Sequence, residues 1–174
     1  MTIAPSRPDQ STVDPGLFRR LLRHHAASVV VITAPGAPPA GFTATSFTSV
    51  SLDPPLVSFS LSRTASTWST VQRAGLVAVH VLGQDQEHVA RTFATSGIDR
   101  FAAHGGWEAG PAGVPLLHGV TARLLCRVVE RVRAGDHTIV LAAPIEGHHV
   151  EDELAPPLVY HAGRYGTLHH GGQR

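Results

Sequence analysis

A run of hydroxyl side chains between residues 43 and 51 is the part of this sequence best suited to hold a ligand. The segment GFTATSFTSVSL at residues 41–52 sets Thr and Ser among apolar residues such as Phe42 and Phe47, so a hydroxyl-lined surface has an apolar backing. Hydroxyls and backbone amides can satisfy the acceptor oxygens of a phosphate without Lys or Arg. A half-buried strand with one wet face has the same pattern, so the segment alone leaves both interpretations open.

Two further segments carry groups that suit the same ligand. SRTAST at residues 62–67 precedes a short helix that we expect to run to Arg73, with Thr64 or Ser66 as its cap; backbone amides at a helix start favour an anion. Gly135-Asp136-His137 predicts a hairpin turn. A histidine at the edge of a strand can donate a hydrogen bond to a nucleotide or carry a proton, although a plain turn explains the motif equally well.

Other chemistry has less support in the sequence. The twelve histidines include the adjacent pairs at 24–25, 148–149 and 169–170, but neighbours in a strand point to opposite faces and cannot easily share one tetrahedral metal ion. We interpret them as solvated surface, with the last pair in a loose tail. Cys126 is the single cysteine, which excludes an intrachain disulfide and a thiolate cluster, and we expect it in the core. Neither a nucleophile triad nor a carboxylate pair is evident.

The composition bounds the class of protein. A chain of 174 residues with 43% hydrophobic and 16% charged residues predicts one globular domain, which we place at residues 14–168 between an arm at 1–13 and a tail at 169–174. The net charge of +1 argues against nucleic-acid binding. We also expect no membrane span and no signal peptide, since no apolar run approaches the ~20 residues of a span. A cytoplasmic location is therefore expected.

The elements that must position these groups are mostly strands. Asp14 as N-cap and Pro15 predict a first helix to about Ala26 with one face packed inward, and residues 85–93 predict another. Residues 94–115 have no regular pattern and read as a lid, a binding loop or a dimer contact. Residues 163–166 lead into the tail. Strands are expected at 28–33, at 41–52, at 56–61, at 76–82, at 120–132 with Arg123, Arg127 and Arg131 on its wet face, at 137–143 as its hairpin partner, and at 157–160.

Four segments in this order resemble the flavin reductase domain family: FRRLLRHHAASVVVIT, GFTATSFTSVSLDPPLVSFSLSRTAST, LLCRVVERVRAGDHTIVLAAPIE and PLVYHAGRYGTL. The resemblance covers residues 17–168. It implies a mainly β fold, a six-stranded Greek-key split β-barrel of the FMN-binding type with short flanking helices. It also implies a homodimeric NAD(P)H:flavin oxidoreductase that supplies reduced FMN or FAD to a partner flavin-dependent monooxygenase.

The resemblance assigns roles to individual residues. His137 would lie beside the nicotinamide and the flavin ring as the catalytic residue. Thr45 stands where many members carry Asn, and Ala142 or Ala143 where members often have Gly, so the choice between FMN and FAD and between NADH and NADPH stays open. The implied flavin contacts are Thr43, Ala44, Thr45, Ser46, Ser49, Val50, Ser51, Ser60, Leu61, Ser66, Thr67 and Trp68, with Arg100, Phe101 and Tyr165 near the pocket mouth.

Two rival functions use the same fold. A flavin held permanently as a prosthetic group could serve another redox reaction, and a non-catalytic split-barrel protein could bind flavin or haem without turnover, because a fold does not fix a function.

Overall fold

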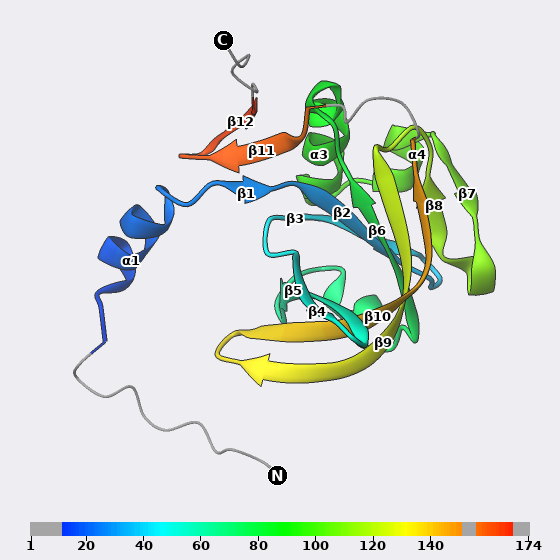
Figure 1. The fold of residues 1–174 in the computed structure, drawn as a ribbon, viewed down its shortest axis with the longest axis horizontal. Coiled ribbons are helices and arrows are strands. Elements are labelled where there is room, and N and C mark those ends of the chain that lie inside the picture. The colour runs from blue at the N-terminus through cyan, green and yellow to red at the C-terminus, as the bar shows by residue number, and fades with distance from the viewer. Residues whose placement is uncertain (1–11, 151–155, 169–174) are drawn as a thin grey trace.

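The architecture is a curled antiparallel sheet, seen in a computed structural model that describes residues 12–150 and 156–168 (Figure 1). The order of the seven-stranded sheet is β3-β2-β6-β9-β10-β5-β4. Its edge strands, β3 and β4, are consecutive in the chain, so the sheet must curl until its two edges approach each other. This is the split-barrel arrangement expected from the sequence, with seven strands in the sheet where six were expected. The strands are β2 (Val30–Ala34), β3 (Ala40–Ala44), β4 (Thr48–Leu52), β5 (Pro55–Ser62), β6 (Leu76–Val81), β9 (Ala122–Ala134) and β10 (His137–His149).

Smaller elements surround this sheet. One three-stranded sheet has the order β1-β11-β12, and a two-stranded hairpin pairs β7 with β8. Among the described residues no helix has the length and apolar character needed to cross a membrane. The bounds are β1 (Ala27–Ser28), β7 (Trp107–Ala109), β8 (Pro115–Leu117), β11 (Leu158–His161), β12 (Arg164–Thr167), α1 (Pro15–Leu22), α2 (Trp68–Val71), α3 (Glu87–Ala94), α4 (Arg100–His104), and the 3₁₀ turns η1 (Gln84–Gln86) and η2 (Pro111–Gly113).

Strand β2 is buried on both faces, as its continuous β-branched run predicts. Val30 and Ile32 face the barrel interior and pack in one cluster with Phe42, Phe59 and other residues of the sheet. Val31 faces outward and packs in a second cluster, which includes side chains of α3 and Leu117 of β8. The barrel therefore has an inner core and an outer core, and β2 contributes to both. Cys126 is fully buried in the inner core, as expected.

The hydroxyl-rich segment is two strands, which corrects the single strand expected over residues 41–52. β3 ends at Ala44 and β4 begins at Thr48, so residues 45–47 cross from one edge of the curled sheet to the other. β3 pairs with β2, whereas β4 pairs with β5. The break has a physical cause, because one straight strand cannot pair at both edges of an open sheet. The crossing places Thr45 and Ser46 at the split of the barrel.

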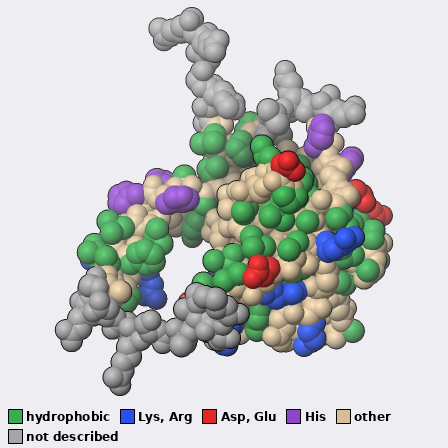
Figure 2. Space-filling view, turned by 60° about the horizontal axis from the view of Figure 1, so that its bottom comes forward, with side chains coloured by type: hydrophobic (Ala, Val, Ile, Leu, Met, Phe, Trp, Pro, Cys, Tyr) green, Lys and Arg blue, Asp and Glu red, His purple; other side chains and the backbone are tan. Residues whose placement is uncertain are grey.

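Helix α1 stands apart from the body of the protein, which contradicts the expectation of an inward-packed face. Asp14 caps the helix as predicted, since its Oδ1 accepts a hydrogen bond from Leu17 N at 2.9 Å. However, none of its residues is buried. Figure 2 shows apolar side chains gathered on the projecting lobe that α1 forms. The exposed apolar residues of α1 are Leu17, Phe18, Leu21 and Leu22, with 41–55% of each accessible.

The segment at 94–115 is more regular than predicted, because α4, β7 and the start of β8 lie within it. Fixed hydrogen bonds anchor this insertion to the sheet: Thr33 Oγ1 donates to Pro115 O at 2.6 Å, and Leu117 N donates to His80 Nε2 at 3.0 Å. Residues 164–167 likewise form β12 and pair with β11 instead of leading into a loose tail. The arm at 1–11 and the tail at 169–174 lie outside the described residues.

A β-bulge in β9 moves Arg131 away from the wet face predicted for it. The register of the β9–β10 pair skips Val129, so the side chains beyond that point change faces. Arg131 Nη2 then donates to Val71 O at 3.1 Å and also to Ala74 O. Burial lowers the pKa of the Arg131 guanidinium. Arg131 therefore fastens the β9–β10 hairpin to the end of α2.

Substitution of Gly41 by alanine is expected to destabilise the fold. A Cβ atom at Gly41 would lie 2.5 Å from Cε1 of Phe93, whose ring is fully buried and packs edge-on against Phe101 at 5.4 Å. Because this ring cannot move freely, overpacking should cost about 1–3 kcal/mol in the free energy of unfolding. Urea unfolding measures the loss. Gly75→Ala is the matched control, since a Cβ there meets nothing within 4 Å; an equal loss in both variants would contradict the steric explanation.

Candidate functional site

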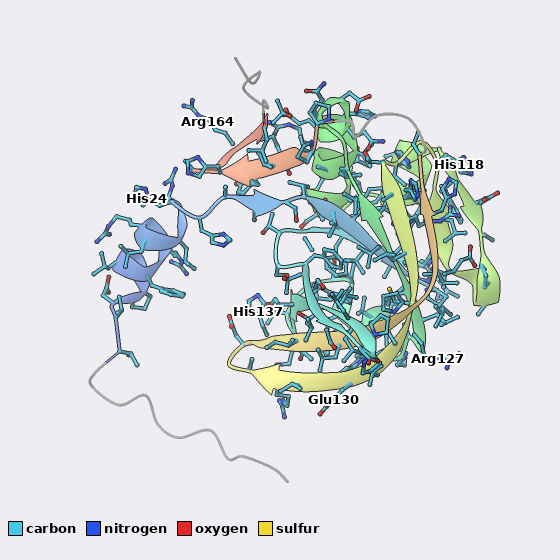
Figure 3. All side chains as sticks on the ribbon, in the orientation of Figure 1. His24, His118, Arg127, Glu130, His137 and Arg164 are labelled. Atoms are coloured by element: carbon cyan, nitrogen blue, oxygen red, sulfur yellow. The ribbon has the colours of Figure 1, made fainter. Side chains whose placement is uncertain are left out.

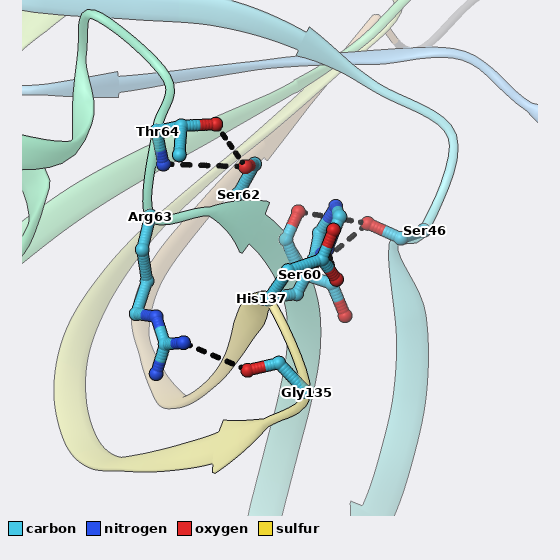
Figure 4. Close-up of polar contacts among 8 residues, drawn as sticks. Ser46, Ser60, Ser62, Arg63, Thr64, Gly135 and His137 are labelled. Atoms are coloured by element: carbon cyan, nitrogen blue, oxygen red, sulfur yellow. Dashed lines mark hydrogen bonds and ion pairs between the residues drawn. The ribbon is translucent and has the colours of Figure 1, made fainter. Parts of the chain in front are cut away.

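The crossing segment at residues 45–47 is tied to strand β5 by a pair of hydrogen bonds. Ser60 N donates to Ser46 Oγ at 2.9 Å, and Ser46 Oγ donates to Ser60 O at 3.2 Å (Figure 4). These bonds close the split of the barrel locally, because they join the edge after β3 to the middle of β5. The sequence predicted both serines as site residues, and the structure brings them into contact.

The end of β5 lies beside the histidine of the β9–β10 hairpin. His137 pairs directly with Ser62 across the two strands. Arg63 holds the hairpin turn, since its backbone N donates to Asp136 O at 3.1 Å and its Nη2 donates to Gly135 O at 2.8 Å (Figure 4). His137 thus lies at a fixed place, at the tip of the hairpin on the open side of the barrel (Figure 3).

Hydroxyl groups continue along the chain beyond Ser62. The Ser62 and Thr64 hydroxyls lie 2.9 Å apart, and Thr64 N donates to Ser62 Oγ at 3.3 Å. Helix α2 then begins after Thr67, whose side chain makes no capping bond, so the cap expected at Thr64 or Ser66 is wrong. The segment between β5 and α2 is instead folded by its own hydroxyls.

Asp136 orients the ring of His137. Nδ1 of His137 lies 2.8 Å from Oδ1 of Asp136. The hydrogen bond from His137 lowers the pKa of the Asp136 carboxyl, which is fully exposed and stays ionised at neutral pH. With a proton on Nδ1, the imidazole donates to Asp136 and turns Nε2 toward whatever binds in front of it. The side chain of His137 is 46% exposed, so a ligand can reach it.

A second group of predicted residues lines one cavity of about 680 Å³. Ser66, Thr67, Arg100 and Phe101 all line it, together with Gly41 near the start of β3. Arg100 is held in place, since its Nε donates to Thr95 O and its Nη1 to Gly41 O, each at 2.8 Å. Burial lowers the pKa of this guanidinium. The cavity thus combines hydroxyls with one fixed cation.

The remaining predicted residues are distributed more widely. The Thr43 hydroxyl donates a hydrogen bond to Ala90 O at 2.6 Å. Ala44 and Leu61 are buried in the inner core. Tyr165 lies on β12 in a separate cavity with Arg91. Thr45 lines a third cavity. The four others are Ser49, Val50 and Ser51 on β4, of which Val50 is 51% exposed, and Trp68, which is half-buried against the inner core. Flavin contact stays a prediction for every residue assigned to it.

Several residues of the site were not assigned from the sequence. Asp136 belongs to it through its contact with the adjacent His137. Ser62 and Arg63 belong to it only through the pairing of β5 with β10 and the contact with the hairpin turn, which the hairpin signal alone does not give. Arg19 and Arg23 line the cavity of Thr45; their spacing of four residues on a helix is a signal that could have been read. Within residues 12–150 and 156–168, no cluster of three or more His, Cys, Asp or Glu side chains could hold a metal ion.

A curled antiparallel sheet with a hydroxyl-lined split and a histidine at its rim defines the class of split-barrel flavin proteins. A sequence model of the family described as flavin reductase like domain matches residues 22–169. The chain belongs to this family. The match confirms the family, the fold type and the enzyme class predicted from the sequence, an NAD(P)H:flavin oxidoreductase.

Three similar proteins place the chain within the family. An NADH:FMN oxidoreductase of Rhodococcus erythropolis is 42% identical over 91% of this chain and 84% of its own length. The reductase subunit of a flavin-dependent monooxygenase from Rhodococcus jostii is 31% identical over 88% of this chain and 77% of its own. The solved NADH:FAD oxidoreductase of Streptomyces globisporus, in complex with NAD and FAD fragments, superposes with a TM-score of 0.83 at 34% identity, over 91% of this chain and 97% of that one.

The residues present fit a flavin nucleotide. The cavity of Ser66 and Arg100 is lined by four residues with hydroxyls, Ser66, Thr67, Ser69 and Thr70, and by one guanidinium, which is a donor set suited to a phosphate group. Asp99 also lines the cavity, but its Oδ1 accepts hydrogen bonds from Phe101 N and Ala102 N. A flavin supplies hydride chemistry once it is bound, so the protein needs to contribute position and exclusion of water more than acid or base.

Proposed function

We propose that the protein reduces a free flavin with a nicotinamide nucleotide and releases the reduced flavin to a partner flavin-dependent monooxygenase. One observation carries the proposal: Ser46, Ser60 and Ser62 lie together at the split of the barrel, and His137 is paired with the last of them. Hydroxyls of this kind can hold a flavin edge, while an exposed imidazole at the rim is free for the second substrate. The relative that is a monooxygenase reductase subunit supports the choice of partner.

The residues would divide the work by position. Ser66, Thr67 and Arg100 bind the phosphate end, and the Ser46–Ser60 pair fixes the edge of the ring. His137 orients the nicotinamide through Nε2, because Asp136 already occupies Nδ1. Holding the two reactants in near contact supplies the largest part of the rate. FMN is the first flavin to test, since the relative from Rhodococcus erythropolis is an NADH:FMN oxidoreductase; a cytoplasmic location goes with the use of NADH.

Anaerobic stopped-flow mixing with NADH tests the proposal. Protein incubated with FMN, and separately with FAD, is expected to bleach the flavin absorbance at a rate that saturates with NADH, and NADPH is compared in the same way. Colourless protein as purified agrees with a flavin that is substrate. Tightly bound flavin in the purified protein, with no turnover of added flavin, would favour the prosthetic-group alternative, and a red-brown haem protein would favour the non-catalytic one.

We further propose that the protein is a homodimer in which α1 is covered by a second copy. Four large apolar side chains on one short helix, each about half exposed, form a surface that a monomer rarely leaves open. Leu17, Phe18, Leu21 and Leu22 recur at helical spacing and so form one stripe. An interface along this stripe would give the homodimer that the family resemblance implies. It would not involve the hydroxyl-lined split.

Phe18→Asp combined with Leu21→Asp is expected to convert the dimer to a monomer. Each aspartate would put a charge into a buried apolar interface, which costs several kcal/mol of association free energy. Light scattering should show the mass falling to the 18.4 kDa of one chain. Val129→Asp on β9, also an exposed apolar position at 59%, is the matched control. A wild-type monomer, or a dimer that survives both substitutions, would rule out this interface.

A further inference from the structure

A basic cavity adjoins the split of the barrel at Thr45. It has a volume of about 640 Å³, and its lining includes Arg19 of α1 and, just after the helix, Arg23 and His25. Tyr160 and the β11–β12 turn also line it. Every charged side chain that lines the cavity is basic. Arg164 lies on the same side of the molecule and adds to its positive charge (Figure 3).

Hydrogen bonds hold the wall of this cavity in place, so it is more than a gap between α1 and the sheet. Arg23 Nη2 donates to Ala162 O at 3.2 Å, and Ala162 N donates to Arg23 O at 3.2 Å. These two bonds fasten the end of α1 to the β11–β12 turn. Arg19 lies one turn earlier than Arg23 and on the same side of the helix, so both line the cavity, which Leu22 of the apolar stripe also lines.

The cavity also has an aromatic surface in a fixed position. The ring of Tyr160 is 5.2 Å from that of Tyr165 in an edge-on contact, and Arg91 stacks over Tyr165 at 5.1 Å. Tyr160 is 37% exposed and borders both this cavity and the neighbouring one. A phenol ring beside two guanidinium groups can stack a nucleobase while the arginines bind its phosphates. An adenosine diphosphate group has both features.

Two substrates of the proposed reaction carry such a group, and the position of the cavity separates them. Ser66, Thr67 and Arg100 lie around Gly41, at the start of β3, whereas Thr45 follows its end. A strand of about five residues spans roughly 16 Å, so the two cavities lie at opposite ends of β3. In the proposed function the phosphate end of a flavin, and with it the adenosine of FAD, would point toward Gly41. The other end of β3 would then remain for the nicotinamide dinucleotide.

We infer that the cavity of Arg19, Arg23 and Tyr160 binds the adenosine diphosphate half of the nicotinamide dinucleotide, so that the nicotinamide enters over Thr45 toward the flavin ring. This rests on the proposed function, because it names where the second substrate of that reaction is held. It makes Arg19 and Arg23 binding residues for the dinucleotide, with no part in the hydride step itself.

The test compares two reductants that differ only in the adenosine half. In the Arg19→Gln/Arg23→Gln variant, KM for NADH should rise about tenfold, whereas KM for reduced nicotinamide mononucleotide should stay within twofold. Inhibition of the wild type by ADP should be competitive with NADH, and the inhibition constant should rise about tenfold in the variant. Arg20→Gln, on the same helix but outside the cavity, is the matched control and should change neither value.

The outcomes separate this inference from the proposed function. Equal changes in KM for both reductants, or a weakened preference for FAD over FMN with NADH unaffected, would overturn it. Arg19→Gln alone should still give about a threefold rise in KM for NADH. This single variant tests the cavity with the bond between Arg23 and Ala162 intact, and circular dichroism checks the fold. If the protein fails to reduce flavin at all, the proposed function falls, and calorimetric titration with ADP alone still decides the cavity. Binding that the Arg19→Gln/Arg23→Gln variant loses supports the inference, whereas no binding, or equal binding by the variant, refutes it.

Discussion

His137→Ala is expected to slow the reduction of bound flavin by NADH by on the order of 10²-fold, the lower end of what a positioned polar group contributes. Flavin affinity should change less than threefold, because the ring of His137 stands at the rim of the split while the hydroxyls of Ser46 and Ser62 lie within it. The loss arises from the missing hydrogen bond that orients the nicotinamide, not from a change in the flavin itself.

Single-turnover stopped flow separates these two effects, with flavin affinity taken from fluorescence quenching. His148→Ala is the matched control, since His148 lies on the same strand but pairs with Arg123 at its far end. Asp136→Asn should cause a smaller loss, because the amide still holds the ring near its place. An unchanged rate with loosened flavin would place His137 on the flavin side and refute the nicotinamide role.

Local patterns were sufficient to predict most strands and the hairpin that carries His137. The β-branched run that became β2 follows directly from residue types, because both of its faces pack in the core. The apolar run that became β6 was also predicted as a strand, and it too is buried on both faces. Cys126 was likewise placed by its apolar neighbours. The order of the quoted segments identified the family, which no single one of them could have done.

The rest depended on contacts between distant segments. The break after Ala44 exists because β3 and β4 pair at opposite edges of the curled sheet, and no local signal marks it. The bulge at Val129 inverted the predicted face of Arg131 in the same way. The amphipathic pattern of α1 was recognised, but a pattern cannot tell whether its apolar face meets its own chain or a second one. The predicted site residues are spread over three cavities, because contacts between distant segments also decide which of them come together.

A buried histidine gives the second large expected effect, this time on stability. His80 is fully buried on β6, where Nδ1 lies 3.1 Å from Val31 O and Nε2 accepts a hydrogen bond from Leu117 N at 3.0 Å. An acceptor Nε2 requires the neutral ring with its proton on Nδ1. Desolvation lowers the pKa of His80 to about 3, against the partial opposing effect of the bond to Val31. A protonated ring would lose the bond that holds β8, and with it the insertion that carries Arg100.

The pH dependence follows from the difference between the two states. The unfolded chain takes up a proton at this histidine near pH 6.5, whereas the folded protein resists it down to about pH 3, so stability is complete above pH 6.5 and falls as the pH falls. Between pH 7 and pH 5 the free energy of unfolding should drop by about 2 kcal/mol from this residue alone. Urea unfolding across that range measures the slope.

His80→Gln keeps one donor and one acceptor but cannot titrate. This variant should therefore be less stable at pH 7 and should lose that part of the slope. His118→Ala, an exposed control, should keep it. Equal pH slopes of stability in the wild type and His80→Gln would mean that His80 is protonated as readily in the folded protein as in the unfolded chain. That result would contradict a neutral imidazole that joins β6 to β8 by a hydrogen bond.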